Sequence, residues 1–382
     1  MVNEIYSGRE RVRRAIEHQA IDRVPLDLGC HFSTGISIFA YQRLREYLGL
    51  SVDRIELIDC TQLLARVDDD VLDMFHIDTV LLNPPFMKTH AWQPREGYCF
   101  QVPEAFCPIR QPDGGWVLKG EHWQSYMPAG GFFFDGYWPD FYMLEEASKL
   151  KYFGARAERL FKETGRFTIF MGYSAFFDGL DFACDMLTDP EKCIEINKER
   201  LDAQIGHFNK MNALFGRYIG AIEVNSDLGM QSAPMVSPAS YGEICMPYLK
   251  KFCEHVHNSS GIKVFMHSCG SIAKLLPAII EAGVDVINPV QISAADMNAA
   301  GLKARYGRDI CFWGGGCDTQ NVLWCASPDM VKAHVQEQMR ILKPESGFVF
   351  NQVHNIMGNV PPENIVAMLS AAYENSAYEE DS

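Results

Sequence analysis

Short runs of apolar residues recur along the chain, and each is followed by a segment in which apolar positions have helical spacing. Unbroken apolar runs of this length are typical of strands that are buried on both faces, as in a parallel sheet. Helix-start signals lie between the runs, for example Ser237-Pro238 and Ser327-Pro328. The eight runs are residues 24–28, 79–82, 167–171, 218–224, 262–266, 284–288, 310–313 and 347–351.

Eight strands that alternate with helices predict an α/β fold, a single (β/α)₈ TIM barrel domain that spans residues 1–382. An open doubly wound sheet is the alternative, but no Gly-x-Gly-x-x-Gly phosphate loop follows any strand. The stretch from Asn83 to about Tyr152 is too long for one crossover. We therefore expect an aromatic-rich insertion in the N-terminal half, a β-hairpin or lid at about 84–152. Its aromatic residues include Trp116, Trp123, Phe132, Phe133, Phe134, Tyr137 and Trp138.

Charge and composition limit the classes of molecule that this protein is expected to bind. The net charge of −15 argues against nucleic acid and against an anionic membrane surface. No run of ~18 uncharged apolar residues is present, so we expect no membrane span. The N-terminus lacks the apolar stretch of a signal peptide. The 12 cysteines are irregularly spaced, which fits a reduced cytoplasm. We therefore expect a cytoplasmic protein.

A histidine and two cysteines lie where predicted strands end, which is where barrels carry their reactive groups. His267 and Cys269 close the fifth run and, two residues apart, point the same way in an extended chain. Cys317 follows the seventh run after three glycines, whose backbone freedom can turn a thiolate inward. One imidazole and two thiolates would hold zinc with one position open, the arrangement of catalytic zinc sites. The alternative is one core histidine and two unrelated buried cysteines.

Other polar side chains gather at the ends of the predicted strands. Asp227 and His354 are the candidates for proton transfer or substrate contact. Taken singly, each such residue is more often a group that orders a loop. Together they predict a polar rim around the metal. The candidate substrate-binding residues are His31, Tyr173, Gln231, Asn288 and Asn355.

Seven segments, spread over nearly the whole chain, carry a resemblance to the uroporphyrinogen decarboxylase superfamily. They are Arg9-Glu-Arg-Val12 with Asp22-Arg-Val-Pro-Leu-Asp-Leu-Gly29, Ser33-Thr-Gly-Ile36, Asp227-Leu-Gly-Met-Gln231, His267-Ser-Cys-Gly270, Phe312-Trp-Gly-Gly-Gly-Cys-Asp-Thr319 and Val353-His-Asn-Ile356. The chain resembles the corrinoid-dependent methyltransferase branch in particular. That resemblance implies a (β/α)₈ barrel in which His267, Cys269 and Cys317 hold zinc. It also allows a homodimer.

The same resemblance bears on the reaction. The decarboxylases use no metal, and their Arg-Gln-Ala-Gly-Arg motif has no counterpart here, so decarboxylation of a porphyrinogen is not expected. The long N-terminal half resembles the members that demethylate a donor. We therefore expect a zinc-dependent transfer of methyl from a small-molecule donor, an aryl methyl ether or similar O-methyl compound, to the cobalt of a corrinoid. No Asp-x-His-x-x-Gly corrinoid signature is present, so the cobalamin must be carried by a separate corrinoid protein.

Four other functions remain open. The first is a methyl-corrinoid:thiol methyltransferase, in which zinc lowers the pKa of the acceptor thiol. A lyase that resembles uroporphyrinogen decarboxylase is a less favoured alternative. A barrel that keeps zinc for structure would need a fourth protein ligand. A zinc-dependent lyase or hydrolase would need a base, and no Glu or His base stands beside the metal motif.

Overall fold

A six-stranded parallel sheet forms the centre of the molecule. The computed structural model describes residues 5–136 and 140–378, so Tyr137 and Trp138 of the predicted insertion lie outside the described residues. The strand order is β14-β13-β12-β11-β10-β9, so neighbours in the chain are neighbours in the sheet. The strands are β9 (Ile169–Ser174), β10 (Ala221–Asn225), β11 (Lys263–His267), β12 (Val286–Asn288), β13 (Cys311–Trp313) and β14 (Phe348–Val349).

The register of this sheet places polar residues side by side at its carboxyl edge. Asn225 at the end of β10 pairs with His267 at the end of β11. His267 pairs in turn with Asn288 at the end of β12. The apolar residues that precede them are buried on both faces, which is why these runs have no polar alternation.

The first two predicted strands form only isolated bridges. Leu26 bridges to Phe350, and Thr79 bridges to Phe167, both in parallel orientation. The backbone N–H of Asp78 also donates to the carbonyl of Leu26 at 2.8 Å. The prediction of an α/β fold built on a parallel sheet is therefore confirmed, with six of the eight predicted runs forming its strands.

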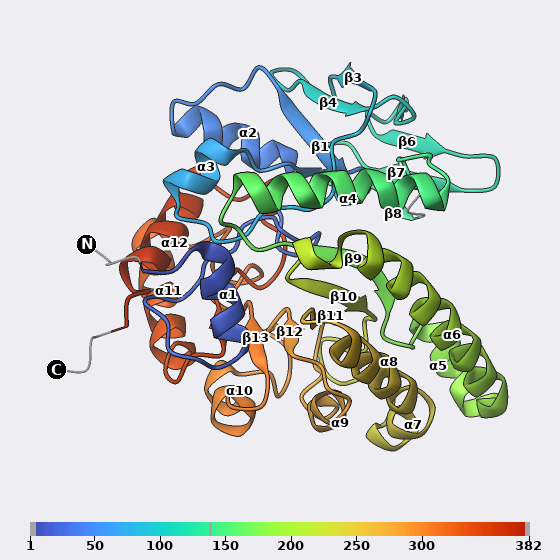
Figure 1. Ribbon diagram of the computed structural model, residues 1–382. Coiled ribbons are helices and arrows are strands. Elements are labelled where there is room, and N and C mark those ends of the chain that lie inside the picture. Colours follow the sequence, from blue (N-terminus) through green and yellow to red (C-terminus); the bar gives the residue numbers. More distant parts are fainter. Residues whose placement is uncertain (1–4, 137–139, 379–382) are drawn as a thin grey trace.

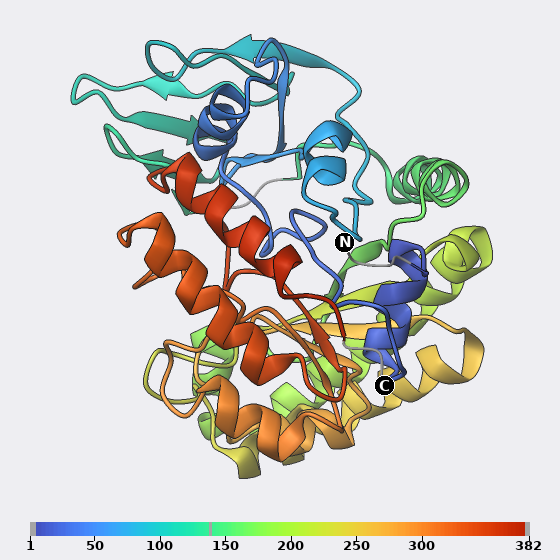
Figure 2. The same cartoon turned by 90° about the vertical axis from the view of Figure 1, so that its left-hand side faces the viewer.

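Helices surround this sheet, as the two views in Figures 1 and 2 show. Several begin at a capping side chain: those of Asp189, Ser237 and Ser327 each accept a hydrogen bond from a backbone N–H of the first helical turn, and the two serines were predicted helix starts. Among the described residues, none of the helices combines the length and the apolar character that a membrane span requires. The helices that follow the strands of the parallel sheet are α5 (Gly179–Thr188), α6 (Pro190–Phe215), α7 (Pro238–Ile244), α8 (Met246–Ser259), α9 (Leu276–Glu281), α10 (Ala299–Tyr306), α11 (Pro328–Leu342) and α12 (Pro362–Glu374).

The N-terminal half adds two small sheets, which lie above the parallel sheet in both views (Figures 1 and 2). One has the order β2-β1-β4-β3 and the other the order β5-β6-β7-β8. Strands β3 to β8 lie between residues 84 and 152, whereas β1 and β2 precede this range and were not predicted. The elements are α1 (Gly8–Ile16), α2 (Ile38–Tyr47), β1 (Ile55–Asp59), β2 (Leu64–Ala65), α3 (Asp69–Met74), β3 (Thr89–Trp92), β4 (Phe100–Pro103), β5 (Ile109–Arg110), β6 (Trp116–Lys119), β7 (Gln124–Met127), β8 (Asp135–Gly136) and α4 (Glu146–Glu163).

Candidate metal centre

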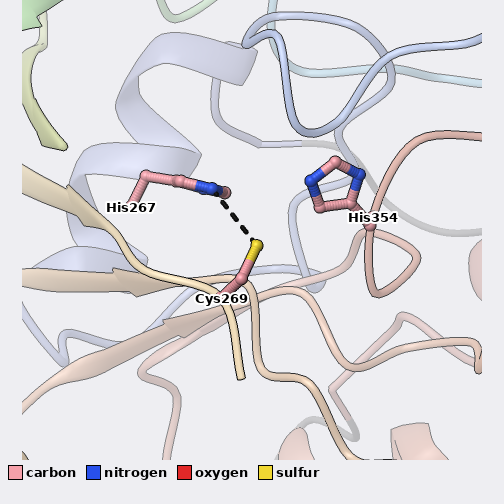
Figure 3. A group of neighbouring side chains, drawn as sticks. All are labelled: His267, Cys269 and His354. Atoms are coloured by element: carbon pink, nitrogen blue, oxygen red, sulfur yellow. Dashed lines mark hydrogen bonds between the residues drawn. The ribbon is translucent and has the colours of Figure 1, made fainter. Parts of the chain in front are cut away.

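Three side chains at the carboxyl edge of the sheet form a group that could hold a metal ion. His267 ends β11, Cys269 follows two residues later, and His354 lies in the loop after β14. One ligand atom from each lies within 4.8 Å of the other two. Figure 3 shows the Cys269 sulfur between the two imidazole rings. The Cys269 sulfur is 3.4 Å from Nε2 of His267.

The amide of Asn288 fixes which nitrogen of His267 faces this group. Nδ2 of Asn288 donates to the carbonyl of Trp313 at 2.9 Å, which leaves Oδ1 to face the imidazole. Oδ1 lies 3.0 Å from Nδ1 of His267, and an oxygen there requires the proton on Nδ1. Oδ1 also accepts from the hydroxyl of Ser33 at 2.6 Å. Nε2 of His267 therefore presents its lone pair to the group, as a metal-binding histidine must.

Burial keeps all three groups in their uncharged forms when no metal is bound. Burial, then the neighbouring His267, lowers the pKa of His354 to about 4. Burial and the charge of His31 also lower the pKa of His267. Burial, then the carboxylate of Asp227, raises the pKa of the Cys269 thiol. Neutral imidazoles suit a metal, and a bound cation would favour the thiolate of Cys269.

The group contains His354 where the sequence predicted Cys317. Cys317 is fully buried in the hydrophobic core and pairs through its backbone with Gln352. The turn before it passes through Gly314 and Gly315, both at positive φ, and carries the chain back along residue 352. Burial raises the pKa of the Cys317 thiol. Cys317 is outside the group of three within the described residues, and its role as a ligand stays a prediction.

The two residues predicted for proton transfer lie beside the metal group or within it. Asp227 is in the loop after β10, and its Oδ1 accepts from the backbone N–H of Cys269 at 2.9 Å. The same oxygen is 3.6 Å from Nε2 of His267, and 55% of the Asp227 side chain is exposed. Asp227 therefore faces both the metal group and solvent, whereas His354 is a member of the group itself.

The five predicted substrate-binding residues do not share one environment in the structure. His31 lines the cavity that contains the metal group. The hydroxyl of Tyr173 instead lies 3.0 Å from Nδ1 of His207 on α6. Gln231 donates to the carbonyl of Ser293 at 2.6 Å. Substrate contact by these residues stays a prediction.

The side chains of Asn288 and Asn355 both form hydrogen bonds within the protein. Asn288 orients His267, as described above. The side chain of Asn355 donates to the carbonyl of Phe32 and to Oε1 of Gln62, and it accepts from the backbone N–H of Gly35. Asn355 therefore ties the loop after β14 to two loops of the N-terminal half.

A buried carboxylate that the sequence analysis did not single out also faces the cavity. Glu223 lies in β10 and is 4% exposed. Its Oε1 is 2.7 Å from Nε2 of His31, and its Oε2 accepts from the backbone N–H of Gly172. Burial would raise the pKa of Glu223, but the contact with His31 lowers it overall. The signal was available, since Glu223 is a charged residue inside an apolar run.

The three residues of the metal group, together with His31, Asp227 and Glu223, line a cavity of about 600 Å³, a size that suits a small organic molecule. One part of its wall comes from the carboxyl edge of the parallel sheet. The opposite part comes from the N-terminal half. The aromatic side chains of this wall are Phe32, Phe86, Phe141, Tyr142 and Phe153.

Residues 211–375 match the family model described as uroporphyrinogen decarboxylase (URO-D). The match runs from α6 to the end of α12 and includes the metal group. The resemblance to the uroporphyrinogen decarboxylase superfamily is thereby confirmed. The search of curated proteins found no match.

Comparison with solved structures bears on the fold. A methyltransferase from Methanosarcina mazei is similar with a TM-score of 0.59 and 15% identity, over 97% of this chain and 99% of that chain. The two proteins therefore share a fold. A 3-keto-D-glucoside 4-epimerase from E. coli has a TM-score of 0.36 at 14% identity, over 59% of this chain and 85% of that chain. Dispersin B has a TM-score of 0.34 at 9% identity, over 91% and 99%.

Proposed function

We propose that this protein is a zinc-dependent methyltransferase. It moves a methyl group from a small donor, an aryl methyl ether or similar O-methyl compound, to the cobalt of a separate corrinoid protein. The observation that carries the proposal is the group of His267, Cys269 and His354, which faces the cavity and lies within the residues that match the URO-D model. The fold shared with the Methanosarcina mazei methyltransferase supports the reaction class.

The residues present fit a zinc ion. Imidazole nitrogen and thiolate sulfur are the ligand types that zinc prefers, and Asn288 leaves Nε2 of His267 free to bind. His267 and Cys269 would hold the ion. The third ligand would be His354, which lies in the group, or Cys317, which the family resemblance implies. When bound, zinc supplies a Lewis acid for the heteroatom from which the methyl group departs.

The remaining tasks belong to the chain. The aromatic wall of the cavity can pack against an aryl group, and a bound aryl group would displace water from it. Asp227 is placed to pass a proton to the demethylated product, because its carboxylate faces both the metal group and solvent. Glu223 holds His31 in one orientation at the cavity wall. The cobalamin would arrive on the corrinoid protein, docked over the mouth of the cavity.

We propose further that the parallel sheet closes into the (β/α)₈ barrel expected from the sequence. The segment at Leu26 bridges to Phe350 beside β14 and receives a hydrogen bond from the N–H of Asp78. The segment at Thr79 bridges to Phe167, just before β9. In such a barrel the metal group would lie at the carboxyl ends of the strands, where barrel enzymes have their active sites.

Metal content and methyl transfer test the proposal together. Purified protein should bind about one zinc per chain, as a single site requires. It should consume cobalt(I) of a corrinoid protein when an O-methyl donor is supplied. His267→Ala should lose both properties. Cys253→Ala, which removes a fully buried thiol from α8, is the matched control and should keep both.

Two further variants identify the third ligand. Zinc loss in His354→Ala but not in Cys317→Ala would support the geometry seen here, and the reverse would support the ligand set of the resemblance. Wild-type protein without zinc would overturn the metal proposal. Zinc with methyl transfer only from a methyl-corrinoid to a thiol would support the alternative methyltransferase.

A further inference from the structure

Asp59 is a buried carboxylate in the cavity wall opposite the parallel sheet. It ends β1 and is 7% exposed. Its Oδ1 accepts from the backbone N–H groups of Thr61 at 2.9 Å and Gln62 at 2.6 Å. Among the described residues both backbone hydrogen bonds go to Oδ1 and none goes to Oδ2, and the side chain of Gln62 lies near the same carboxylate. Burial raises the pKa of Asp59 to about 6, so the side chain is still mainly ionised at pH 7.

Among the described residues, two of the three other carboxylates of the cavity wall contact a basic side chain, and the third, Asp227, is exposed to solvent. Glu223 contacts His31 at 2.7 Å. Asp140 accepts from the ammonium of Lys149 at 3.0 Å. Asp227 accepts from the backbone N–H of Cys269. Lys149 is the one lysine or arginine among the described residues that line the cavity. The wall therefore has more negative than positive side chains, and Asp59 is its buried carboxylate with a free oxygen.

The loop that carries Asp59 is fixed relative to the metal group. Oε1 of Gln62 accepts from Nδ2 of Asn355 at 2.8 Å, and Asn355 follows His354 in the chain. The carbonyl of Thr61 accepts from the backbone N–H of Phe134 at 2.7 Å. A molecule in the cavity therefore meets Asp59 on a loop that these two hydrogen bonds hold in place.

A role in ordering the turn explains only one of the two carboxylate oxygens of Asp59. The hydrogen bonds from residues 61 and 62 need one oxygen, and an asparagine would supply it equally well. The other oxygen belongs to a residue that lines the cavity, and Oδ2 is not one of the fully buried polar atoms, so it is open to a molecule in the cavity. A hydroxyl or ammonium group of a bound molecule would complete it.

We propose that Asp59 determines the specificity of the site, because its free oxygen accepts a hydrogen bond from a hydroxyl or ammonium group of the methyl donor. The site then takes neutral or cationic donors and discriminates against donors that carry a carboxylate. That the bound molecule is a methyl donor rests on the proposed function. The preference for neutral or cationic molecules over carboxylates concerns binding alone and can be measured without methyl transfer.

Binding of demethylated aryl products tests this inference without methyl transfer. The panel is three phenols with one scaffold, which carry a second hydroxyl, an aminoethyl group or a carboxylate. Calorimetry would measure their binding to zinc-loaded wild type, Asp59→Asn and Asp53→Asn. Asp53→Asn is the matched control, since it removes the same charge from an exposed residue outside the cavity.

Wild type should bind the hydroxyl and ammonium compounds at least ~10-fold more tightly than the carboxylate, as expected for one hydrogen bond to a charged group. Asp59→Asn should lose most of that preference, and Asp53→Asn should keep it. Equal preferences in wild type and Asp59→Asn would overturn the inference, as would failure of wild type to bind any member. Discrimination without any methyl transfer to cobalt would uphold it and reject the proposed function.

Discussion

The buried carboxylate of Asp59 should make the folded protein less stable as the pH rises, and Asp59→Asn should remove that effect. The asparagine has the same shape and can accept the hydrogen bonds from Thr61 and Gln62, so the turn is kept. What changes is the charge. An uncharged amide does not have to be transferred from water into the cavity wall as an ion.

The magnitude follows from the pKa of Asp59, which burial raises from 3.8 to about 6. A pKa that is raised on folding means that the folded state favours the protonated acid. The contribution to stability is therefore fully present below pH ~4 and is lost as the pH rises through about 6. A shift of about 2 units, at ~1.4 kcal/mol per unit, corresponds to a loss of about 3 kcal/mol above pH ~7.

Urea unfolding from pH 4.5 to pH 8 measures this directly. The free energy of unfolding of Asp59→Asn minus that of wild type should rise by about 2 kcal/mol over this pH range, with the steepest change near pH 5, midway between the unfolded and folded pKa values. The same difference for Asp53→Asn, an exposed residue, should stay nearly constant. A difference for Asp59→Asn that is flat or falls with pH would show that the carboxylate is not desolvated, and would remove the physical basis of its proposed role.

Two further substitutions test the orientation of His267 and the contribution of a buried ion-pair network to stability. Asn288→Ala removes the oxygen that holds Nδ1 of His267, so zinc affinity measured by chelator competition should fall about 10- to 100-fold. Asp78 accepts from both Arg11 and Arg23 in a buried network away from the cavity. Asp78→Ala should therefore lower the free energy of unfolding by about 3–5 kcal/mol in urea, with zinc content unchanged in the folded protein. An unaltered midpoint would contradict this account.

The strands of the parallel sheet could be predicted because their burial on both faces leaves an uninterrupted apolar run. The prediction of a strand at 262–266 corresponds to β11, and that at 310–313 to β13. The run at 24–28 forms only a bridge, and it contains Pro25, which has no N–H to extend a ladder. The strand β1 was missed because it belongs to a small sheet whose packing partner, β4, lies about forty residues further along the chain.

The candidate site could be predicted where its residues are close in sequence. His267 and Cys269 follow one strand, and the spacing alone places them on one side of an extended chain. His354 was predicted for proton transfer, since nothing in the sequence shows how the loop after β14 turns toward Cys269. Asp59 was missed for the same reason: its exposure to the cavity depends on how the N-terminal half packs over the sheet, which no local pattern encodes.

The three residues that could hold a metal lie within the residues that match the URO-D model, and Asp59 lies at the end of β1, outside them. Under the proposed function, substitutions around β1 would therefore alter which donor is accepted and would leave the metal-binding residues unchanged. Related proteins with the same metal-binding residues would differ in the donors they accept through changes in the N-terminal half alone. An engineer who wants a new donor would begin with a library at Asp59 and its aromatic neighbours, and would leave the carboxyl edge of the parallel sheet untouched.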